Sequence, residues 1–154
     1  MEKENIQYRK FFYRTQHIQQ LGGYQIYPAG YYADDASILL FCNNNGIAST
    51  EESLIVYRKS ENNISSSSCW NVEKSKAALK YYQWIIDEFP MKQQDEQIIQ
   101  QRLDFDLYTY FSAALNIHQS IQILNCIPVN IWNWKKKLLC LYKFILNSYA
   151  KQIK

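Results

Sequence analysis

Short apolar runs separated by polar turns occupy the first half of the chain. Tyr24–Tyr32 is a β-like run that a Pro-Ala-Gly sequence interrupts, as at an edge or a bulge of a sheet. Ser37–Cys42 is a compact apolar run, and Asn43–Gly46 after it tolerates the positive φ of a turn. Leu54–Tyr57 is a third run, although the Ser-Thr-Glu-Glu sequence before it also fits a helix cap. We predict three strands here.

A second pair of apolar runs lies in the last third of the chain. Leu107–Leu115 alternates in a way that fits the two faces of a strand, and Ser120–Pro128 alternates similarly. Asn116–Gln119 between them is polar. The pattern predicts a β-hairpin.

Three helical regions surround these runs. Residues 1–21 predict an N-terminal helix, which Gly22 and Gly23 end. Residues 72–102 predict a helical pair that Pro90 divides. Residues 130–152 predict a long C-terminal helix.

The predicted order is one helix, three strands, a helical insertion, two strands and one helix. With 154 residues the chain fits one domain. A helical region between the third and fourth of five strands is the order of an OB fold, a five-stranded β-barrel. We therefore predict a barrel over residues 24–128, with Gly30 at the bend of the first strand. A mixed α+β domain with a meander sheet is the alternative architecture.

The C-terminal helix carries more than one apolar stripe. One stripe holds Ile131, Trp134, Leu138, Leu141 and Ile145, and a second holds Trp132, Leu139, Tyr142, Leu146 and Tyr149. Either both stripes pack inside the domain, or one packs inward and the other contacts a partner protein. We favour the second interpretation, since Trp and Tyr are frequent interface anchors. The predicted partner-binding residues are Trp132, Trp134, Leu138, Leu141, Tyr142, Ile145 and Tyr149.

Charge is unevenly distributed along the chain. The formal net charge is +3, but residues 107–154 carry six basic residues and no acidic residue. Lys135, Lys136 and Lys137 form the densest group, which fits either a solvated face or phosphate contact. Together with Tyr57 at the end of the third predicted strand, and Arg58 and Lys59 directly after it, they are the candidate nucleic-acid-binding residues. The strand tyrosines could stack bases, or fill a core and an interface.

The sequence offers little for catalysis. Four cysteines form no CxxC pair or zinc-ligand spacing, and His17 and His118 stand apart from any nucleophile arrangement. No glycine-rich phosphate loop is present. We predict no enzymatic activity, no cofactor and no metal. The first residues, Met1–Glu4, are polar and of mixed charge, so we predict no secretory signal. The apolar run Leu138–Tyr142 is too short for a membrane span.

In element order, size and the hairpin-then-helix ending, residues 24–152 resemble the small single-OB subunits of replication-protein-A-like trimers, and most of all the smallest subunit of the telomeric CST complex. The chain departs from this family by reading Asn43–Gly46 where an Asp-Gly-(Ser/Thr) segment is frequent, and by its long insertion. The resemblance implies a non-catalytic nuclear protein on telomeric chromatin. It implies docking on larger OB-fold subunits of a heterotrimer through the barrel and the C-terminal helix. It further implies an association with telomerase and indirect or weak contact with single-stranded telomeric DNA.

Two other functions remain open on the sequence. One is a structural subunit of a large assembly, such as a respiratory complex or a ribosome, which would place the protein in the mitochondrion or on ribosomes. The other is a helical DNA-binding module built on residues 72–152, which a low strand content would favour.

Overall fold

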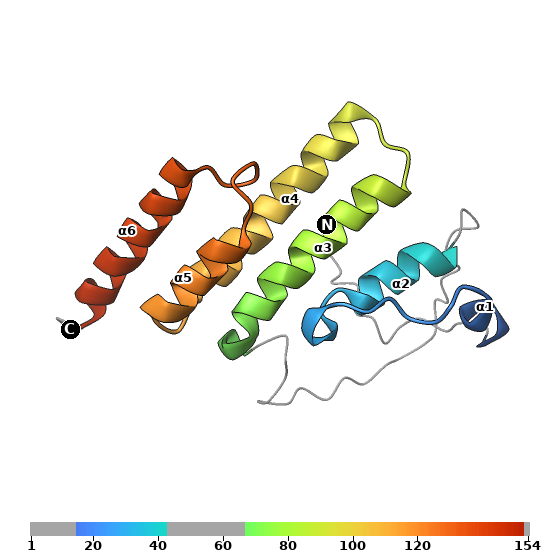
Figure 1. Cartoon of the computed structure of the whole chain (residues 1–154), viewed down its shortest axis with the longest axis horizontal. Helices are drawn as coiled ribbons and strands as arrows, with labels where there is room; N and C mark the ends of the chain where they lie inside the picture. The colour runs from blue at the N-terminus through green and yellow to red at the C-terminus, as the bar shows by residue number, and fades with distance from the viewer. Residues whose placement is uncertain (1–14, 43–66, 153–154) are drawn as a thin grey trace, which may run out of the picture.

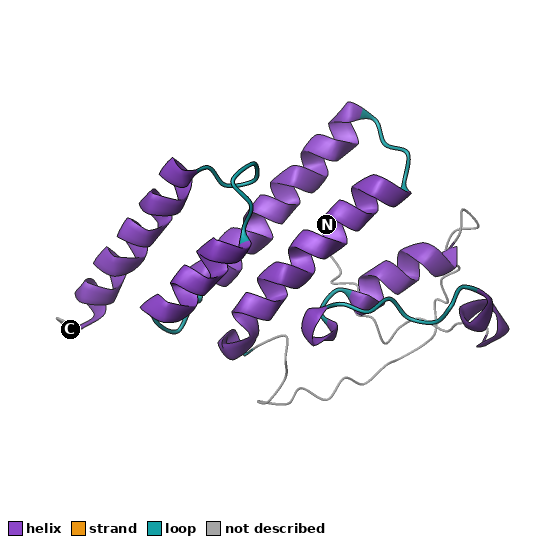
Figure 2. Ribbon diagram, viewed as in Figure 1, coloured by secondary structure: helices purple, strands orange, loops and turns teal. Residues whose placement is uncertain are grey.

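The computed structural model describes residues 15–42 and 67–152, and all the regular structure in these residues is helical. The N-terminal part holds α1 (Thr15–Gln20), the 3₁₀ turn η2 (Pro28–Gly30) and α2 (Ala33–Cys42). The C-terminal part holds η3 (Ser68–Trp70), α3 (Asn71–Glu88), α4 (Gln93–Ser112), α5 (Ile117–Cys126) and α6 (Trp134–Gln152). The predicted five-stranded OB barrel and its meander alternative are both wrong for these residues (Figure 2).

The helices α3 to α6 run alternately up and down, so that α4 and α6 point in the same direction (Figure 1). The segment with α1 and α2 lies on the side of α3 away from α6 (Figure 1). The core lies among α3, α4, α5, the loop before α6, and α6 itself. Its buried members are Ala78, Tyr82, Ile85, Leu103, Leu107, Tyr110, Phe111, Ile123, Leu124, Ile127, Trp132 and Cys140.

The fourth predicted strand is the second half of α4. Leu107, Tyr110 and Phe111 are buried, while Thr109 and Ser112 between and after them are exposed. This i, i+3, i+4 spacing follows the helical period, and the alternation that predicted a strand was incidental.

The fifth predicted strand and its turn form α5. Ser120, Ile123, Leu124 and Ile127 are buried at the i, i+3, i+4, i+7 spacing of one helix face. The Asn116 side-chain oxygen accepts a hydrogen bond from the Gln119 backbone N–H at 2.9 Å. The asparagine that predicted a hairpin turn therefore caps a helix.

The N-terminal predictions have mixed outcomes. The third predicted strand, Leu54–Tyr57, lies outside the described residues. Ser37–Cys42 belongs to α2, and Tyr24–Tyr32 is a loop containing η2 rather than a strand. Gly22 and Gly23 follow the end of α1 with φ of +81° and +88°, which confirms them as helix terminators.

A tyrosine cluster attaches the N-terminal segment to α3 and α4. The Tyr32 ring stacks on Tyr81 with centroids 4.7 Å apart. The hydroxyl groups of Tyr32 and Tyr82 both donate to Asp106 Oδ2, at 2.8 and 2.7 Å. Burial raises the pKa of both phenols, with the negative charge of Asp106 adding to the effect. Tyr32 adopts a φ of +67°, a conformation that persists only where the surroundings hold it.

Buried amide side chains attach helix ends to one another. Asn71 at the start of α3 donates from Nδ2 to the backbone oxygens of Tyr110 and Ala113 at the end of α4, at 3.0 and 3.1 Å. Gln119 on α5 donates from Nε2 to the Ser68 oxygen at 2.8 Å. The two bonds from Asn71 satisfy carbonyl groups at the C-terminal end of α4, which the helix itself leaves without partners. The Ser68 oxygen also accepts the Asn71 backbone N–H, so the Gln119 bond is its second.

Candidate docking surface on α6

The inward face of α6 is narrow. Cys140 is buried, and Leu141 and Phe144 are partly buried against the core. The Phe144 ring meets Phe111 of α4 edge-on, with centroids 5.9 Å apart. Lys137 donates from Nζ to the backbone oxygens of Leu124, at 2.7 Å, and Ile127. One side of α6 is therefore fixed to α4 and α5.

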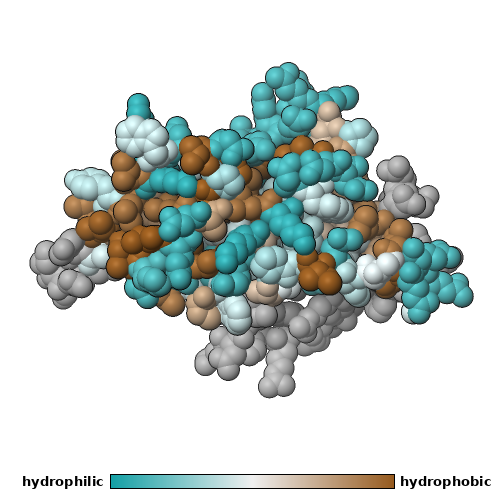
Figure 3. Space-filling view, in the orientation of Figure 1, coloured by the Kyte–Doolittle hydropathy of each residue, from teal (hydrophilic) through white to brown (hydrophobic). Residues whose placement is uncertain are grey.

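The outward face of α6 is apolar and exposed. Trp134 and Tyr142 are 61% and 60% exposed, which is unusual for side chains of this size. Hydrophobic atoms lie on the surface in the region of α6 when the molecule is seen in the orientation of Figure 1 (Figure 3). The six large exposed apolar residues, which we call the α6 face, are Trp134, Leu138, Leu139, Tyr142, Ile145 and Leu146.

The predicted partner-binding residues divide between this face and the core. Trp134, Leu138, Tyr142 and Ile145 lie on the α6 face. Trp132 is 0% exposed, because α6 begins at Trp134 and the preceding loop turns the Trp132 ring into the core.

Of the remaining two predicted residues, the structure places only the Leu141 side chain. Leu141 is partly buried and packs against the core. The backbone of Tyr149 is part of α6, while its side chain is outside the described set.

Two of the three clustered lysines bind within the domain. Lys136 Nζ contacts Asp104 Oδ1 and lies 4.7 Å from the centroid of the Trp132 ring. Lys137 binds the last carbonyls of α5, where a cation also opposes the negative end of the helix dipole. Lys135 is exposed, with Nζ 5.7 Å from the Trp134 ring centroid. Of the three ammonium groups, only that of Lys135 is therefore exposed for phosphate contact, and it already lies over the Trp134 ring. Tyr57, Arg58 and Lys59 lie outside the described residues.

Sequence reasoning missed a second exposed apolar row, on α4. Ile98, Phe105 and Tyr108 are exposed at 63%, 59% and 46%. Their spacing of seven and three residues places them on one side of a helix. The helical period was available in the sequence, but the region containing Tyr108 was predicted as a strand.

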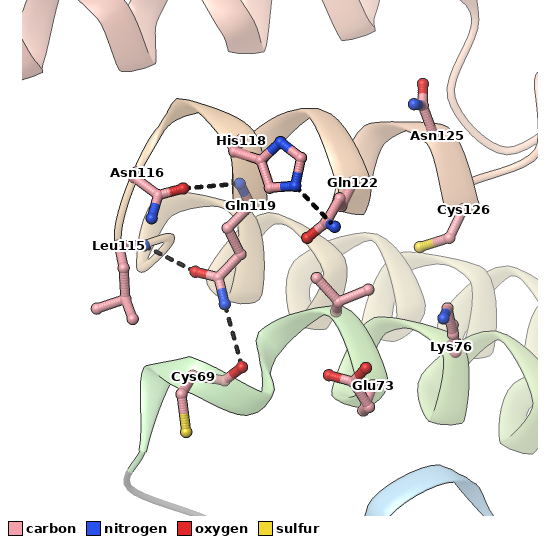
Figure 4. A pocket seen from close by; sticks show the side chains of 11 residues that line it. Cys69, Glu73, Lys76, Leu115, Asn116, His118, Gln119, Gln122, Asn125 and Cys126 are labelled. Atoms are coloured by element: carbon pink, nitrogen blue, oxygen red, sulfur yellow. Dashed lines mark hydrogen bonds between the residues drawn. The ribbon is translucent and has the colours of Figure 1, made fainter.

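A pocket of about 650 Å³ lies between the start of α3 and α5 (Figure 4). His118 Nε2 and the Gln122 side-chain nitrogen are 3.1 Å apart. The Gln119 side chain donates from Nε2 to the backbone oxygen of Cys69 at 3.3 Å (Figure 4). Cys126 also lines the pocket, and burial raises the pKa of its thiol, which disfavours a nucleophilic thiolate. Among the described residues no three His, Cys, Asp or Glu side chains are grouped so as to hold a metal ion.

No helix in the described part of the chain combines the length and the apolar character needed to cross a bilayer. Comparison of the chain with protein-family models, with curated proteins and with solved structures finds no match. The exposed surface of the domain is therefore the feature that indicates a function.

Proposed function

We propose that this chain is a non-catalytic helical binding module whose α6 face docks on another protein chain. The observation that supports the proposal is the six large apolar side chains exposed along one face of a helix whose other face is packed. Exposed apolar patches of this kind mark interaction sites in soluble domains. Trp134 and Tyr142 are of the residue types that most often dominate interface energies.

The α6 face alone provides a modest driving force. Full burial of one large apolar side chain contributes roughly 1.5–3 kcal/mol, and these side chains are already about half covered. Six of them would contribute on the order of 6 kcal/mol. Association itself costs an estimated 4–15 kcal/mol or more. A stable complex therefore requires contacts beyond α6.

The telomeric interpretation loses its basis. Its support was the order of strands in an OB barrel, and the described residues contain helices where those strands were predicted. The alternative of a structural subunit in a larger assembly requires only a folded domain with a docking face, and it is compatible with the helical fold.

The helical DNA-binding alternative fits the helix content but not the engaged lysines. Lys136 and Lys137 would have to leave Asp104 and the carbonyls of α5 before they could bind phosphate. Breaking those contacts would offset the gain from phosphate binding. The surface chemistry of α6 favours a protein partner.

The proposal predicts that replacing Trp134 and Leu138 together by alanine abolishes a stoichiometric partner interaction. The full-length tagged chain would be purified from its own cells, and bound proteins quantified by mass spectrometry. We expect at least a tenfold loss of that partner, because two anchors of the interface are removed.

Ile121→Ala is the matched control. Ile121 is an exposed apolar residue on α5, so this variant removes apolar surface outside the α6 face. It should retain the partner, and both variants should keep the wild-type thermal unfolding midpoint. Retention of the partner by the Trp134/Leu138 variant, or the absence of any stoichiometric partner, would contradict the proposal.

A further inference from the structure

The pocket between α3 and α5 brings a carboxylate and an ammonium group together. Glu73 and Lys76 both line it from α3, and Figure 4 shows them across the pocket from the side chains of α5. Their spacing of three residues puts the Cβ atoms roughly 5–6 Å apart on one side of the helix. Neither side chain makes an ion pair with another described residue. The pocket therefore presents two opposite charges that are close together and available to a ligand.

Both charges also act on the Cys126 thiol, which lines the same pocket from α5. Burial is the main cause of the raised pKa of this thiol, while the Lys76 ammonium lowers the pKa and the Glu73 carboxylate raises it further. The two charged groups therefore lie near the α5 wall. Because its pKa is raised, Cys126 stays protonated at neutral pH and adds no third charge.

The α5 side of the pocket is polar but not charged. Helix α5 contributes His118, Gln122 and Asn125 to the lining, and residues 117–126 contain no Asp, Glu, Lys or Arg. The lining as a whole therefore carries one negative and one positive group. A phosphate ligand would face the carboxylate, and a polyamine would face the ammonium group. The balance of charge favours a molecule that carries both signs.

The remaining lining offers aliphatic surface and hydrogen bonds. Val72 and Leu115 supply aliphatic side chains, and Leu115 is 64% exposed, so that a ligand gains by covering it. The amides of Gln122 and Asn125 both donate and accept hydrogen bonds. The volume of about 650 Å³ falls within the range of small-molecule sites, roughly 300–1,000 Å³. The pocket thus suits a small dipolar molecule with an apolar part.

The Gln119 side chain holds the two sides of the pocket together. Its Nε2 donates to the backbone oxygens of Ser68 and Cys69, just before α3, at 2.8 and 3.3 Å. Its Oε1 accepts from the Leu115 backbone N–H at 2.8 Å. Gln119 is buried, so water competes little for these bonds. The pocket is formed before a ligand arrives, which reduces the ordering cost of binding.

We propose that this pocket binds a free α-amino acid with an aliphatic side chain. The ammonium group of the ligand pairs with Glu73, its carboxylate pairs with Lys76, and its side chain covers Val72 and Leu115. Both charged groups of an α-amino acid are attached to one carbon, so they fit between two side-chain charges one helical turn apart. The site lies on α3 and α5, away from the α6 face, and it does not depend on the proposed docking function.

Three ligands of similar size test the proposal. They are L-leucine, L-leucinamide, which lacks the carboxylate, and isocaproate, which lacks the ammonium group. Each is titrated into the full chain and followed by nuclear magnetic resonance. We expect leucine at millimolar concentration to bind saturably and to shift the amide signals of the residues that line the pocket. Each analogue should bind about fivefold more weakly, because one of two ion pairs is lost.

Charge variants assign the two ion pairs. Lys76→Gln should weaken leucine about fivefold and leave leucinamide unchanged, whereas Glu73→Gln should weaken leucine similarly and leave isocaproate unchanged. Lys135→Gln is the matched control, since Lys135 is exposed on α6, and it should bind leucine as the wild type does. The Trp134/Leu138 variant should also keep leucine binding, which separates this site from the docking function. All variants should keep the wild-type circular dichroism spectrum.

Absence of saturable leucine binding to the wild-type chain would overturn the proposal. Equal affinity for leucine and isocaproate would show a site that reads only the carboxylate, and equal affinity for leucine and leucinamide a site that reads only the ammonium group. Either result would contradict recognition of a dipolar ligand. Unchanged leucine affinity in both charge variants would place the binding outside this pocket.

Discussion

Trp132→Ala is expected to lower the free energy of unfolding by about 3–5 kcal/mol, the range for truncating a large aromatic residue in a core. Trp132 is fully buried, and its ring meets Phe111 edge-on with centroids 6.4 Å apart. Its indole N–H also donates to Asp104, so the substitution removes both packing and a hydrogen bond. Urea denaturation followed by far-ultraviolet circular dichroism measures the change.

Trp134→Ala is the matched control for this prediction. Trp134 lies two residues further along, but it is mostly exposed on α6, so its loss should change the free energy of unfolding by about 0.5 kcal/mol or less. Equal losses in the two variants would contradict the assignment of Trp132 to the core and Trp134 to the surface.

Asp106→Ala is expected to lower the free energy of unfolding by about 2–4 kcal/mol, because hydrogen bonds to a charged acceptor are strong and buried donors left unpaired are unfavourable. Its carboxylate accepts from the hydroxyls of Tyr32 and Tyr82, and its other oxygen lies 3.4 Å from Arg102 Nε. The same denaturation experiment measures the effect. The N-terminal segment should also become more accessible to protease, since Tyr32 is one of its attachments to α3 and α4.

Asp87→Ala provides the comparison for Asp106. Asp87 is exposed near the end of α3, where it accepts one hydrogen bond from Gln83 at 2.9 Å. Its removal should change stability by about 0.5 kcal/mol or less. An Asp106 variant as stable as the Asp87 variant would show that the tyrosine cluster does not depend on the carboxylate.

The sequence predicts those helices that have clear boundaries. Pro90 divides the helical region as expected, with α3 ending at Glu88 and α4 beginning at Gln93. Short apolar runs were misjudged because periods of 2 and 3.6 overlap over so few residues. Leu107 and Phe111, for example, share a face of a strand and also a face of a helix. The strand and helix interpretations of this run cannot be separated by apolar positions alone.

The candidate surface was predictable in part. Trp134, Leu138, Tyr142 and Ile145 follow the helical period and lie on the exposed face. Trp132 fits the same helical period, but it precedes α6, which begins at Trp134. The turn that buries the Trp132 side chain depends on tertiary packing around Asp104. The α4 row was not predicted, because a region interpreted as a strand gives no reason to look for a helical face.

Hydroxyl-radical footprinting of the isolated full chain tests the central claim most directly, since it measures the solvent exposure of individual aromatic side chains. The account predicts that Trp134 and Tyr142 are modified at least about tenfold faster than Trp132, because side chains packed in a core exclude solvent. Protection of Trp134 and Tyr142 to the level of Trp132 would show that the chain covers its own α6 face, and would contradict a surface available to a partner.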